Sequence, residues 1–233
     1  MIHFEHVTKR YEGARDALKG VTLTVAEGEL AFLTGRSGAG KSTVLKLIGL
    51  IERATRGVVT VGGHNLGKLK NRAIPAHRQQ IGMVFQDNKL LADRSAYENV
   101  ALPLIIAGAG AREIGRRARA ALDQVGLLDR ERYPPKSLSA GEQQRVGIAR
   151  AIVNRPKVVI ADEPTGNLDP DLALEVMTLF KRLNAAGTTM LIASHDLHLV
   201  AHLGGRRIHL VDGQVGDRPP DDDQPGDPGR GRS

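Results

Sequence analysis

The sequence predicts an α/β fold that combines a largely parallel sheet with one helical insertion. Short apolar runs alternate along the chain with longer segments of helical period, which is the pattern of strands joined by crossover helices. From about residue 87 to residue 155 helical patterns replace this alternation, and apolar runs return after it. These two observations indicate one α/β core that a helical segment interrupts.

The apolar runs predict where the strands lie. Residues 2–7 alternate between apolar and polar side chains, as in a half-buried strand, whereas residues 30–33 are all apolar, as in a buried one. A helix is expected over residues 41–51. Further strands are expected at residues 58–61, 81–85, 158–161, 190–193 and 208–211.

The clearest helix of the insertion has its apolar residues on one face. Ile114, Ala118, Ala121 and Val125 follow one another at steps of four, three and four residues. This is the spacing of one side of an α-helix, so we expect that side to pack on the rest of the protein.

The composition is that of a globular protein without disulfides. Hydrophobic residues make up 41% of the 233 residues, enough for the core of one large domain or of two subdomains. The absence of cysteine excludes disulfide bonds and thiolate metal sites. The chain starts without the features of a signal peptide, and no apolar run approaches the roughly 20 residues that cross a bilayer. We therefore expect a cytoplasmic protein that reaches a membrane only through a partner.

The formal net charge of +7 leaves three interpretations open. They are a solvated basic surface, contact with an anionic membrane leaflet, and binding of nucleic acid. Nucleic acid is the least favoured, because aromatic residues make up only 3% of the chain and are not interleaved with the basic ones.

The end of the chain has the composition of a disordered segment. Residues 217–233 are rich in Pro, Gly and Asp and contain no large apolar side chain. Such a segment cannot bury enough surface to offset its ordering entropy. We place the folded domain at residues 1–213 and a disordered extension at 214–233.

Residues 35–42 form a phosphate-binding loop. They read G-R-S-G-A-G-K-S, a full match to G-x-x-x-x-G-K-[ST], and they stand between an expected strand and an expected helix. Glycines allow backbone N–H groups to close around phosphate oxygens, and the helix N-terminus adds a partial positive charge. Lys41 is expected to reach the β- and γ-phosphates of ATP, and the Ser42 hydroxyl to ligate Mg²⁺. The expected nucleotide-binding residues are Gly35, Ser37, Gly38, Ala39, Gly40, Lys41, Ser42 and Thr43.

Two adjacent carboxylates follow the apolar run at residues 158–161. Successive side chains of a strand point to opposite sides, so Asp162 and Glu163 can have different roles. One can hold Mg²⁺ through water, and the other can orient the water that attacks the γ-phosphate.

Residues 138–145, which read L-S-A-G-E-Q-Q-R, closely resemble the signature motif of ABC ATPases. The phosphate loop, Gln86, the signature, the acidic strand, residues 167–169 and His195 also occur in that family's order, so the resemblance extends over residues 1–213. It implies a P-loop NTPase (RecA-like) core with a small antiparallel β subdomain and a helical ABC-specific subdomain at about 87–155.

The resemblance also implies roles for residues around the nucleotide. Tyr11 would stack on the adenine, although an ordinary edge-strand tyrosine is the alternative. Gln86 would contact Mg²⁺ and the attacking water, with a plain strand-end amide as the alternative. Asp162 would hold the metal, Glu163 would act as the base, and His195 would bond the γ-phosphate.

Further residues would act across a homodimer that encloses two ATP molecules. Ser139 and Gly141 would contact the γ-phosphate of ATP bound to the other subunit, and Asp169 would lie at the interface. The chain departs from the family at Ala140, where glycine is usual. A positive φ there would make alanine cost roughly 1 kcal/mol, whereas a helix start would make it harmless.

Other stretches resemble the cell-division branch of the family. They are residues 2–7, 31–35, 103–108 and 145–151. Members of that branch pair with an integral membrane protein and transmit ATP-driven shape changes across the inner membrane to switch on septal peptidoglycan hydrolysis. The resemblance implies a peripheral location on the cytoplasmic face of that membrane. The partner's cytoplasmic helix would dock on residues 86–107, and septal ring proteins are further candidate contacts.

Three alternatives remain. The first is an ATPase subunit for lipoprotein release or macrolide-type export, which would share the same motifs. The second is a division scaffold that does not hydrolyse ATP, and the residues that argue against it are the intact Lys41, Asp162, Glu163 and His195. The third, an ABC protein that handles nucleic acid, would need a long coiled-coil or zinc insertion, and the sequence contains neither.

Overall fold

The computed structural model describes residues 1–13, 16–166 and 168–216, and its centre is a six-stranded sheet. The strand order is β10-β9-β3-β8-β7-β6. All neighbouring pairs from β9 to β6 are parallel, and β10 is antiparallel to β9. The strands are β3 (Leu30–Thr34), β6 (Ile81–Val84), β7 (Val158–Asp162), β8 (Thr189–Ala193), β9 (Arg206–Val211) and β10 (Gln214–Val215). The predicted α/β core with a largely parallel sheet is confirmed.

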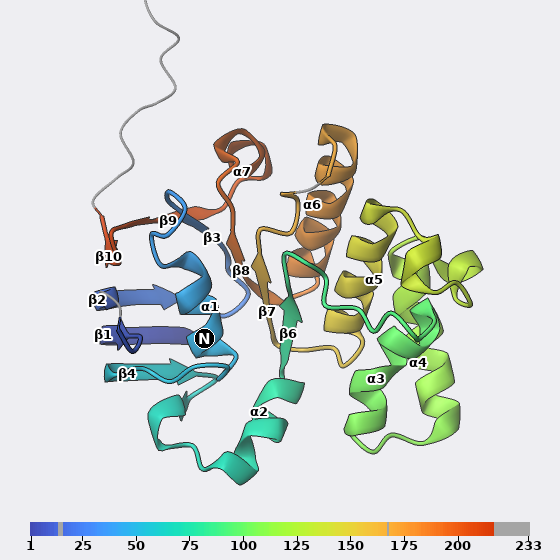
Figure 1. Ribbon diagram of the computed structural model, residues 1–233, viewed down its shortest axis with the longest axis horizontal. Helices are drawn as coiled ribbons and strands as arrows, with labels where there is room; N and C mark the ends of the chain where they lie inside the picture. Colours follow the sequence, from blue (N-terminus) through green and yellow to red (C-terminus); the bar gives the residue numbers. More distant parts are fainter. Residues whose placement is uncertain (14–15, 167, 217–233) are drawn as a thin grey trace, which may run out of the picture.

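A second, antiparallel sheet lies beside the first, with helix α1 between them (Figure 1). Its strand order is β2-β1-β4-β5. The strands are β1 (Ile2–Arg10), β2 (Asp16–Val25), β4 (Arg56–Val61) and β5 (His64–Asn65). This sheet is the small antiparallel β subdomain that the family resemblance implies.

The sequence did not predict β2. Its second half alternates, with Val21, Leu23 and Val25 buried and the residues between them exposed. The first half breaks the alternation at Gly20, whose φ is +68°, and the register with β1 shifts around Val7 and Lys9. Such irregularities of pairing conceal a strand whose alternation would otherwise be visible.

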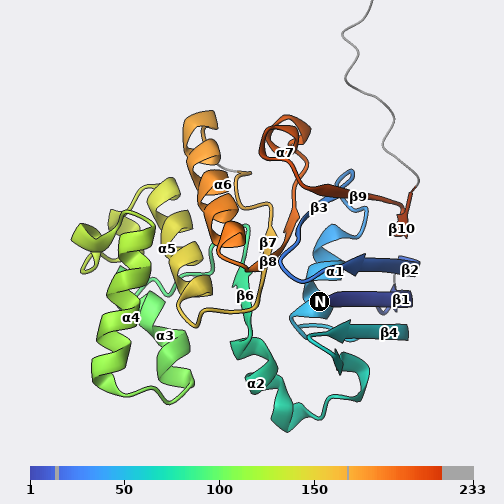
Figure 2. The same ribbon diagram turned by 180° about the vertical axis from the view of Figure 1, so that it is seen from behind.

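Seven α-helices surround the sheets in the described part of the chain (Figures 1 and 2). They are α1 (Lys41–Ile48), α2 (Ile74–Gln79), α3 (Ala96–Ile106), α4 (Ala111–Gln124), α5 (Ala140–Ile152), α6 (Pro170–Ala185) and α7 (Leu197–Leu203). Helices α3, α4 and α5 pack on one another and stand away from α1 and the antiparallel sheet. Short 3₁₀ turns occur at Leu66–Lys68, Asn71–Ala73, Leu128–Arg130 and Pro135–Ser137.

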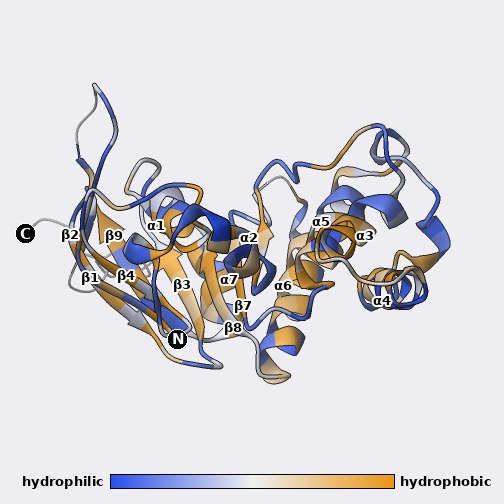
Figure 3. Cartoon of the chain, turned by 90° about the horizontal axis from the view of Figure 1, so that it is seen from below, coloured by the Kyte–Doolittle hydropathy of each residue, from blue (hydrophilic) through white to orange (hydrophobic). Residues whose placement is uncertain are grey.

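The parallel sheet is buried on both faces. Ala31 and Leu33 of β3 join the core formed with α1 and the antiparallel sheet, whereas Phe32 between them joins the core formed with α3 to α7. Side chains that alternate across a strand thus serve two cores, which is why these runs are continuously apolar. Figure 3 shows β3, β7 and β8 as an apolar interior.

Helix α4 confirms the expected apolar face. Ala118 and Ala121 are buried, as is Val125 just beyond its end, and Ile114 packs against the same core. In the described residues no helix combines the length and the apolar character that membrane crossing takes.

Two boundaries differ from the sequence-based expectation. The helix expected over residues 41–51 ends at Ile48, because Gly49 and a left-handed Leu50, with φ of 50°, follow it. Residues 214–216, which were expected to belong to the extension, are part of the fold instead, because Gln214 and Val215 pair with β9 and the Gly216 N–H donates to the His209 carbonyl. Residues 217–233, predicted to be disordered, lie outside the described residues.

Candidate active site

The phosphate loop joins β3 to α1 and depends on its glycines. Gly35, Gly38 and Gly40 have φ of 139°, 79° and 108°. A Cβ on Gly35 would lie 2.2 Å from the Leu210 carbonyl oxygen, and one on Gly40 would lie 2.8 Å from that of Ala17. Side chains at both positions would therefore displace backbone, so the loop conformation requires glycine there.

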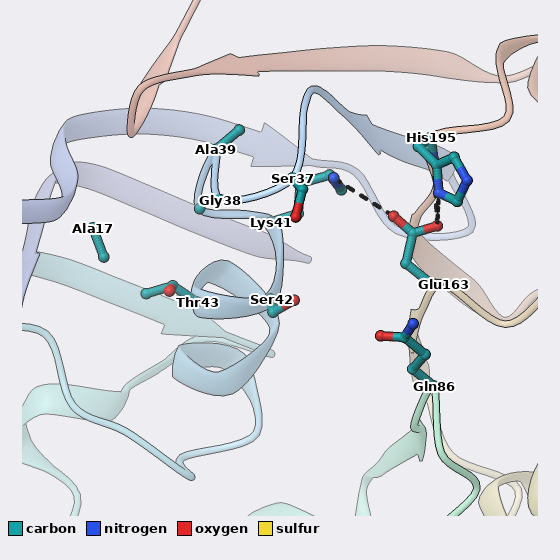
Figure 4. Close-up of a pocket in the computed structure, with 11 residues that line it drawn as sticks. Ala17, Ser37, Gly38, Ala39, Lys41, Ser42, Thr43, Gln86, Glu163 and His195 are labelled. Atoms are coloured by element: carbon teal, nitrogen blue, oxygen red, sulfur yellow. Dashed lines mark hydrogen bonds and ion pairs between the residues drawn. The ribbon is translucent and has the colours of Figure 1, made fainter. Parts of the chain in front are cut away.

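The loop forms one wall of a pocket of about 480 Å³ (Figure 4). This volume lies within the usual range for small-molecule sites. The lining comprises the loop, the start of α1, and one residue from each of four other segments. The lining residues are Ala17, Ser37, Gly38, Ala39, Gly40, Lys41, Ser42, Thr43, Gln86, Glu163 and His195. The structure thus brings together the phosphate loop and three of the residues predicted to act on the γ-phosphate.

Lys41 is buried at the centre of this wall, with 7% of its surface exposed. Its Nζ donates to the carbonyl oxygens of Gly35 at 2.7 Å and Arg36 at 3.3 Å, and lies 3.5 Å from Oε1 of Glu163. The ammonium group therefore lies where several oxygens converge. Phosphate oxygens are strong acceptors for the three N–H groups of this ammonium.

Glu163 connects Lys41 with His195 (Figure 4). Its Oε2 accepts hydrogen bonds from His195 Nδ1 at 2.8 Å and from the His195 backbone N–H at 3.3 Å. Glu163 follows the end of β7 with a φ of 47°, a region in which non-glycine residues are strained. This turn directs a carboxylate that is 14% exposed into the pocket.

Asp162 has the features expected of a metal-binding carboxylate. Its Oδ1 is buried and has no hydrogen-bond partner among the described residues. Burial raises the pKa of Asp162, as does the charge of Glu163, whereas the nearby Ser42 hydroxyl and Lys41 act in the opposite direction. A divalent cation would supply the missing partner and keep the carboxylate ionised. The residues present therefore fit Mg²⁺ held between Ser42 and Asp162.

Gln86 follows β6 and points into the pocket from the side facing Ser42 (Figure 4). An amide in this position can accept from a bound water and donate to a phosphate oxygen. Its role remains a prediction, as do those of the other site residues.

Tyr11 is not among the described residues that line the pocket. Its ring lies under the ammonium group of Lys9, whose Nζ is 4.8 Å from the ring centroid, and its buried hydroxyl has no hydrogen-bond partner in the part of the chain that the structure describes. Lys9 is in turn held by Glu52 at 2.7 Å. The adenine-stacking role predicted for Tyr11 would need the ring to leave this position.

The signature residues begin α5. Ser139 is its N-cap, where Oγ accepts from the Glu142 N–H at 3.2 Å, and the Glu142 carboxylate accepts from the Ser139 N–H at 2.8 Å. This capping box leaves the Ser139 hydroxyl hydrogen free to donate. Ala140 is the first helical residue and does not have a positive φ. Alanine is therefore harmless at this position.

Gly141 and Asp169 both contact Leu172 of α6, one through its side chain and the other through its backbone N–H. A Cβ on Gly141 would lie 2.8 Å from Cδ1 of Leu172, and Asp169 caps α6 by accepting from the Leu172 N–H at 3.1 Å. None of Ser139, Gly141 and Asp169 lines the pocket of the same chain. The N-termini of α5 and α6 thus lie together, and these three residues are not part of that pocket's lining.

Ala17 is the pocket residue that sequence reasoning missed. It lies near the start of β2, the strand that was not predicted. Its carbonyl oxygen is the one that excludes a side chain from Gly40. Alanine carries no reactive group that could mark it as a site residue. The alternation of β2 was therefore the one signal that could have indicated its position.

Comparison with known proteins places the chain in a family. Residues 18–166, more than half of the chain, match the family model of the ABC transporter. The chain belongs to the ABC transporter family. The predicted family, fold and ATPase activity are thereby confirmed.

Curated relatives extend over nearly the whole chain. It is 56% identical over 215 residues to the "Cell division ATP-binding protein FtsE" of Escherichia coli strain K12, covering 92% of this chain and 97% of the relative. The Haemophilus influenzae protein of the same name is 51% identical over 201 residues, covering 86% and 92%. Among solved structures, the dimeric ATP-binding cassette MJ0796, in a post-hydrolysis state bound to ADP and Pi, matches with a TM-score of 0.86. It is 37% identical and covers 93% of this chain and 97% of that one.

Proposed function

We propose that this chain is the ATP-hydrolysing subunit of an FtsEX-like ABC complex that acts in bacterial cell division. The observation that carries the proposal is the 56% identity to a cell-division ATP-binding protein over 97% of that protein's length. The pocket supports the chemistry, because a lysine, a carboxylate and a histidine converge beside the phosphate loop. The partner is an FtsX-like integral membrane protein, which holds the chain at the cytoplasmic face of the inner membrane.

The geometry of the site favours hydrolysis in which ATP takes the place of Glu163 as the anionic partner of Lys41. The γ-phosphate oxygens of ATP replace the Glu163 carboxylate beside Nζ, 3.5 Å away in this structure. Glu163 is then free to accept a proton from water as the water oxygen attacks the γ-phosphorus and the bond to the β–γ bridging oxygen breaks. His195, whose side chain is 68% exposed, bonds the γ-phosphate. Positioning and charge stabilisation supply most of the catalysis in such reactions.

Mg²⁺ bound by Ser42 and Asp162 would neutralise charge that develops on the β- and γ-phosphate oxygens. Gln86 would orient the attacking water from the opposite wall of the pocket. These roles rest on the buried, unpartnered Oδ1 of Asp162 and on the position of Gln86 at the pocket.

The second half of each site comes from the other chain of a homodimer. Dimerisation is supported by the dimeric state of the structural relative. In the closed dimer Ser139 and the N–H groups at the start of α5 cover the γ-phosphate held by the partner's phosphate loop. The free hydroxyl hydrogen of Ser139 and the helix N-terminus suit this role. ATP then joins the chains, and its hydrolysis releases them.

A groove beside α3 is suited to a helix of the membrane partner. Its volume is about 490 Å³, and it lies between β6 and the helices α2, α3 and α5. Leu102, Pro103 and Ile106 line it, and Ile105 and Ile106 are 56% and 65% exposed. Two adjacent, largely exposed isoleucines beside an apolar groove favour a surface that contacts another protein. Movement of this partner would carry ATP-driven changes across the membrane to activate septal peptidoglycan hydrolysis.

The test is the ATPase activity of the complex purified through its tagged ATPase subunit. We expect a membrane protein to co-purify, and we expect Glu163→Gln to abolish hydrolysis and septation together while leaving the complex assembled. If the chain were a scaffold that does not hydrolyse ATP, cells that carry the Glu163→Gln variant would still divide normally. An exporter subunit would co-purify with a membrane protein whose loss spares division and impairs lipoprotein release or drug efflux. Either result would overturn the proposal.

A further inference from the structure

The residues after Gln86 form a turn with two consecutive left-handed residues. Asn88 and Lys89 have φ of 56° and 48°. The Asn88 N–H donates to the Phe85 carbonyl at 3.1 Å, and the Lys89 N–H to the Asp87 carbonyl at 2.5 Å. Asparagine tolerates this region, but lysine rarely adopts it. The turn at residues 85–89 therefore needs stabilisation by contacts with other parts of the protein.

Arg150, in the last turn of α5, supplies that stabilisation. Its Nη1 donates to the Lys89 carbonyl at 2.8 Å, and its Nη2 to the Asn88 carbonyl at 2.5 Å. One planar group thus holds the carbonyls of both left-handed residues, a geometry that a guanidinium allows and an ammonium does not. One turn earlier on α5, a Cβ on Gly147 would lie 3.7 Å from Oδ1 of Asn88. The turn therefore lies directly on the helix.

The guanidinium of Arg150 is committed to these carbonyls. In the described part of the chain its hydrogen-bond partners are the two carbonyls rather than a carboxylate. Burial lowers the pKa of Arg150. A partly buried cation without a counter-ion loses much of its stabilisation if the acceptors move away. Arg150 is therefore sensitive to the position of the turn.

Arg150 also lies where three functional parts of the protein meet. Two residues before the turn, Gln86 lines the nucleotide pocket. At the opposite end of α5, Ser139 begins the helix. Arg150 and Lys89 both line the apolar groove beside α3. The contact between Arg150 and the turn therefore connects the pocket, the signature helix and the groove.

We propose that Arg150 is a positioning residue for ATP hydrolysis. By fixing the left-handed turn at Asn88 and Lys89, it sets the direction of Gln86 toward the pocket and links Gln86 to the signature helix and the groove. The proposal rests on the proposed function, because it takes the pocket as the ATP site. It predicts that loss of the contact slows the chemical step and leaves the binding of ATP by the phosphate loop intact.

The experiment compares Arg150→Ala and Arg150→Lys with the unaltered chain, each in complex with its membrane partner. We expect kcat to fall about tenfold in both, with KM for ATP within about twofold, the pattern of an interaction made in the transition state. Arg150→Lys keeps the charge without the paired donors, so it serves to separate geometry from charge. The control is Arg116→Ala, an exposed arginine of α4, for which we expect no change.

A second-site change separates positioning from a general effect on folding. Glycine adopts positive φ freely, so Lys89→Gly should restore kcat in the Arg150→Ala chain to within about threefold of the unaltered value. Equal loss of kcat, ATP affinity and melting temperature, without rescue by Lys89→Gly, would overturn the proposal, and so would unchanged kcat in Arg150→Ala. Lys41→Ala is measured alongside. If it too kept full activity, the proposed ATP site itself would be wrong.

Discussion

Replacement of Glu163 by glutamine should separate ATP binding from hydrolysis. The change removes the proton acceptor but keeps the size of the side chain. It also removes the carboxylate that lies 3.5 Å from Lys41 Nζ and competes with phosphate for it. We therefore expect slower hydrolysis together with tighter binding of ATP.

The magnitudes follow from the geometry. Loss of a general base costs about 10²- to 10⁴-fold in rate, so kcat should fall by at least about a hundredfold. Two unit charges 3.5 Å apart attract by about 5 kcal/mol at an effective dielectric constant of about 20. Desolvation of both groups offsets most of this in a buried pair. We take about 1 kcal/mol as the net free energy by which Glu163 competes with phosphate for Lys41. Its loss corresponds to about fivefold tighter ATP binding.

The assay measures phosphate release at saturating ATP, and ATP affinity by titration calorimetry in the same preparation. The matched control is Glu113→Gln, a surface carboxylate of α4 paired with Arg117, which should change neither quantity. Glu163→Gln with unchanged kcat, or with weaker ATP binding than the unaltered chain, would refute the reasoning about exchange at Lys41.

Three further predictions concern the loop, a buried histidine and the tail. Gly35→Ala should abolish nucleotide binding and lower the melting temperature, because its Cβ would lie 2.2 Å from the Leu210 carbonyl oxygen; binding at the unaltered affinity would contradict this. Burial lowers the pKa of His77, whose Nε2 bonds the Ile48 carbonyl at 2.8 Å. The unfolded chain thus binds more protons as pH falls through about 6.5, and stability is lost there on acidification. Thermal melts between pH 7.5 and 5.5 should show a smaller decline for His77→Gln than for the unaltered chain, and equal declines would refute the assignment. Deletion of residues 217–233 should leave ATP affinity unchanged by calorimetry, and a clear loss would overturn the interpretation of the tail.

The sequence predicted those parts of the protein whose physics is local. The phosphate loop is encoded in eight consecutive residues between a strand and a helix, so its position needed no tertiary information. The pairing of Glu163 with Lys41 and His195 was not predictable as a distance, because three separate segments bring these side chains together. Their membership of one pocket was predictable, since each comes after the carboxyl end of a strand of the same parallel sheet.

Other features depend on contacts that no local pattern records. Strand β2 was missed because Gly20 interrupts its alternation, and Ala17 of the pocket was missed with it. Tyr11 lies under Lys9 and is not among the lining residues of the pocket, and Lys9 is paired with Glu52, which is distant in the sequence. The sequence did not decide whether Ala140 is strained or harmless. The capping box of Ser139 shows that a helix starts there, so alanine is harmless.

The proposed mechanism depends on ATP that is held by one chain's phosphate loop and covered by the Ser139 region of a second chain. The most direct measurement is the molar mass of the Glu163→Gln chain by light scattering, with and without ATP, compared with the double variant that also carries Ser139→Arg. Ser95→Arg is the matched control, because Ser95 closes the same kind of capping box at the start of α3. We predict an ATP-dependent dimer for Glu163→Gln and for its Ser95→Arg form. For the Ser139→Arg form we predict a monomer that still binds ATP, and ATP-dependent dimers of that form would show that the Ser139 region does not cover the bound nucleotide.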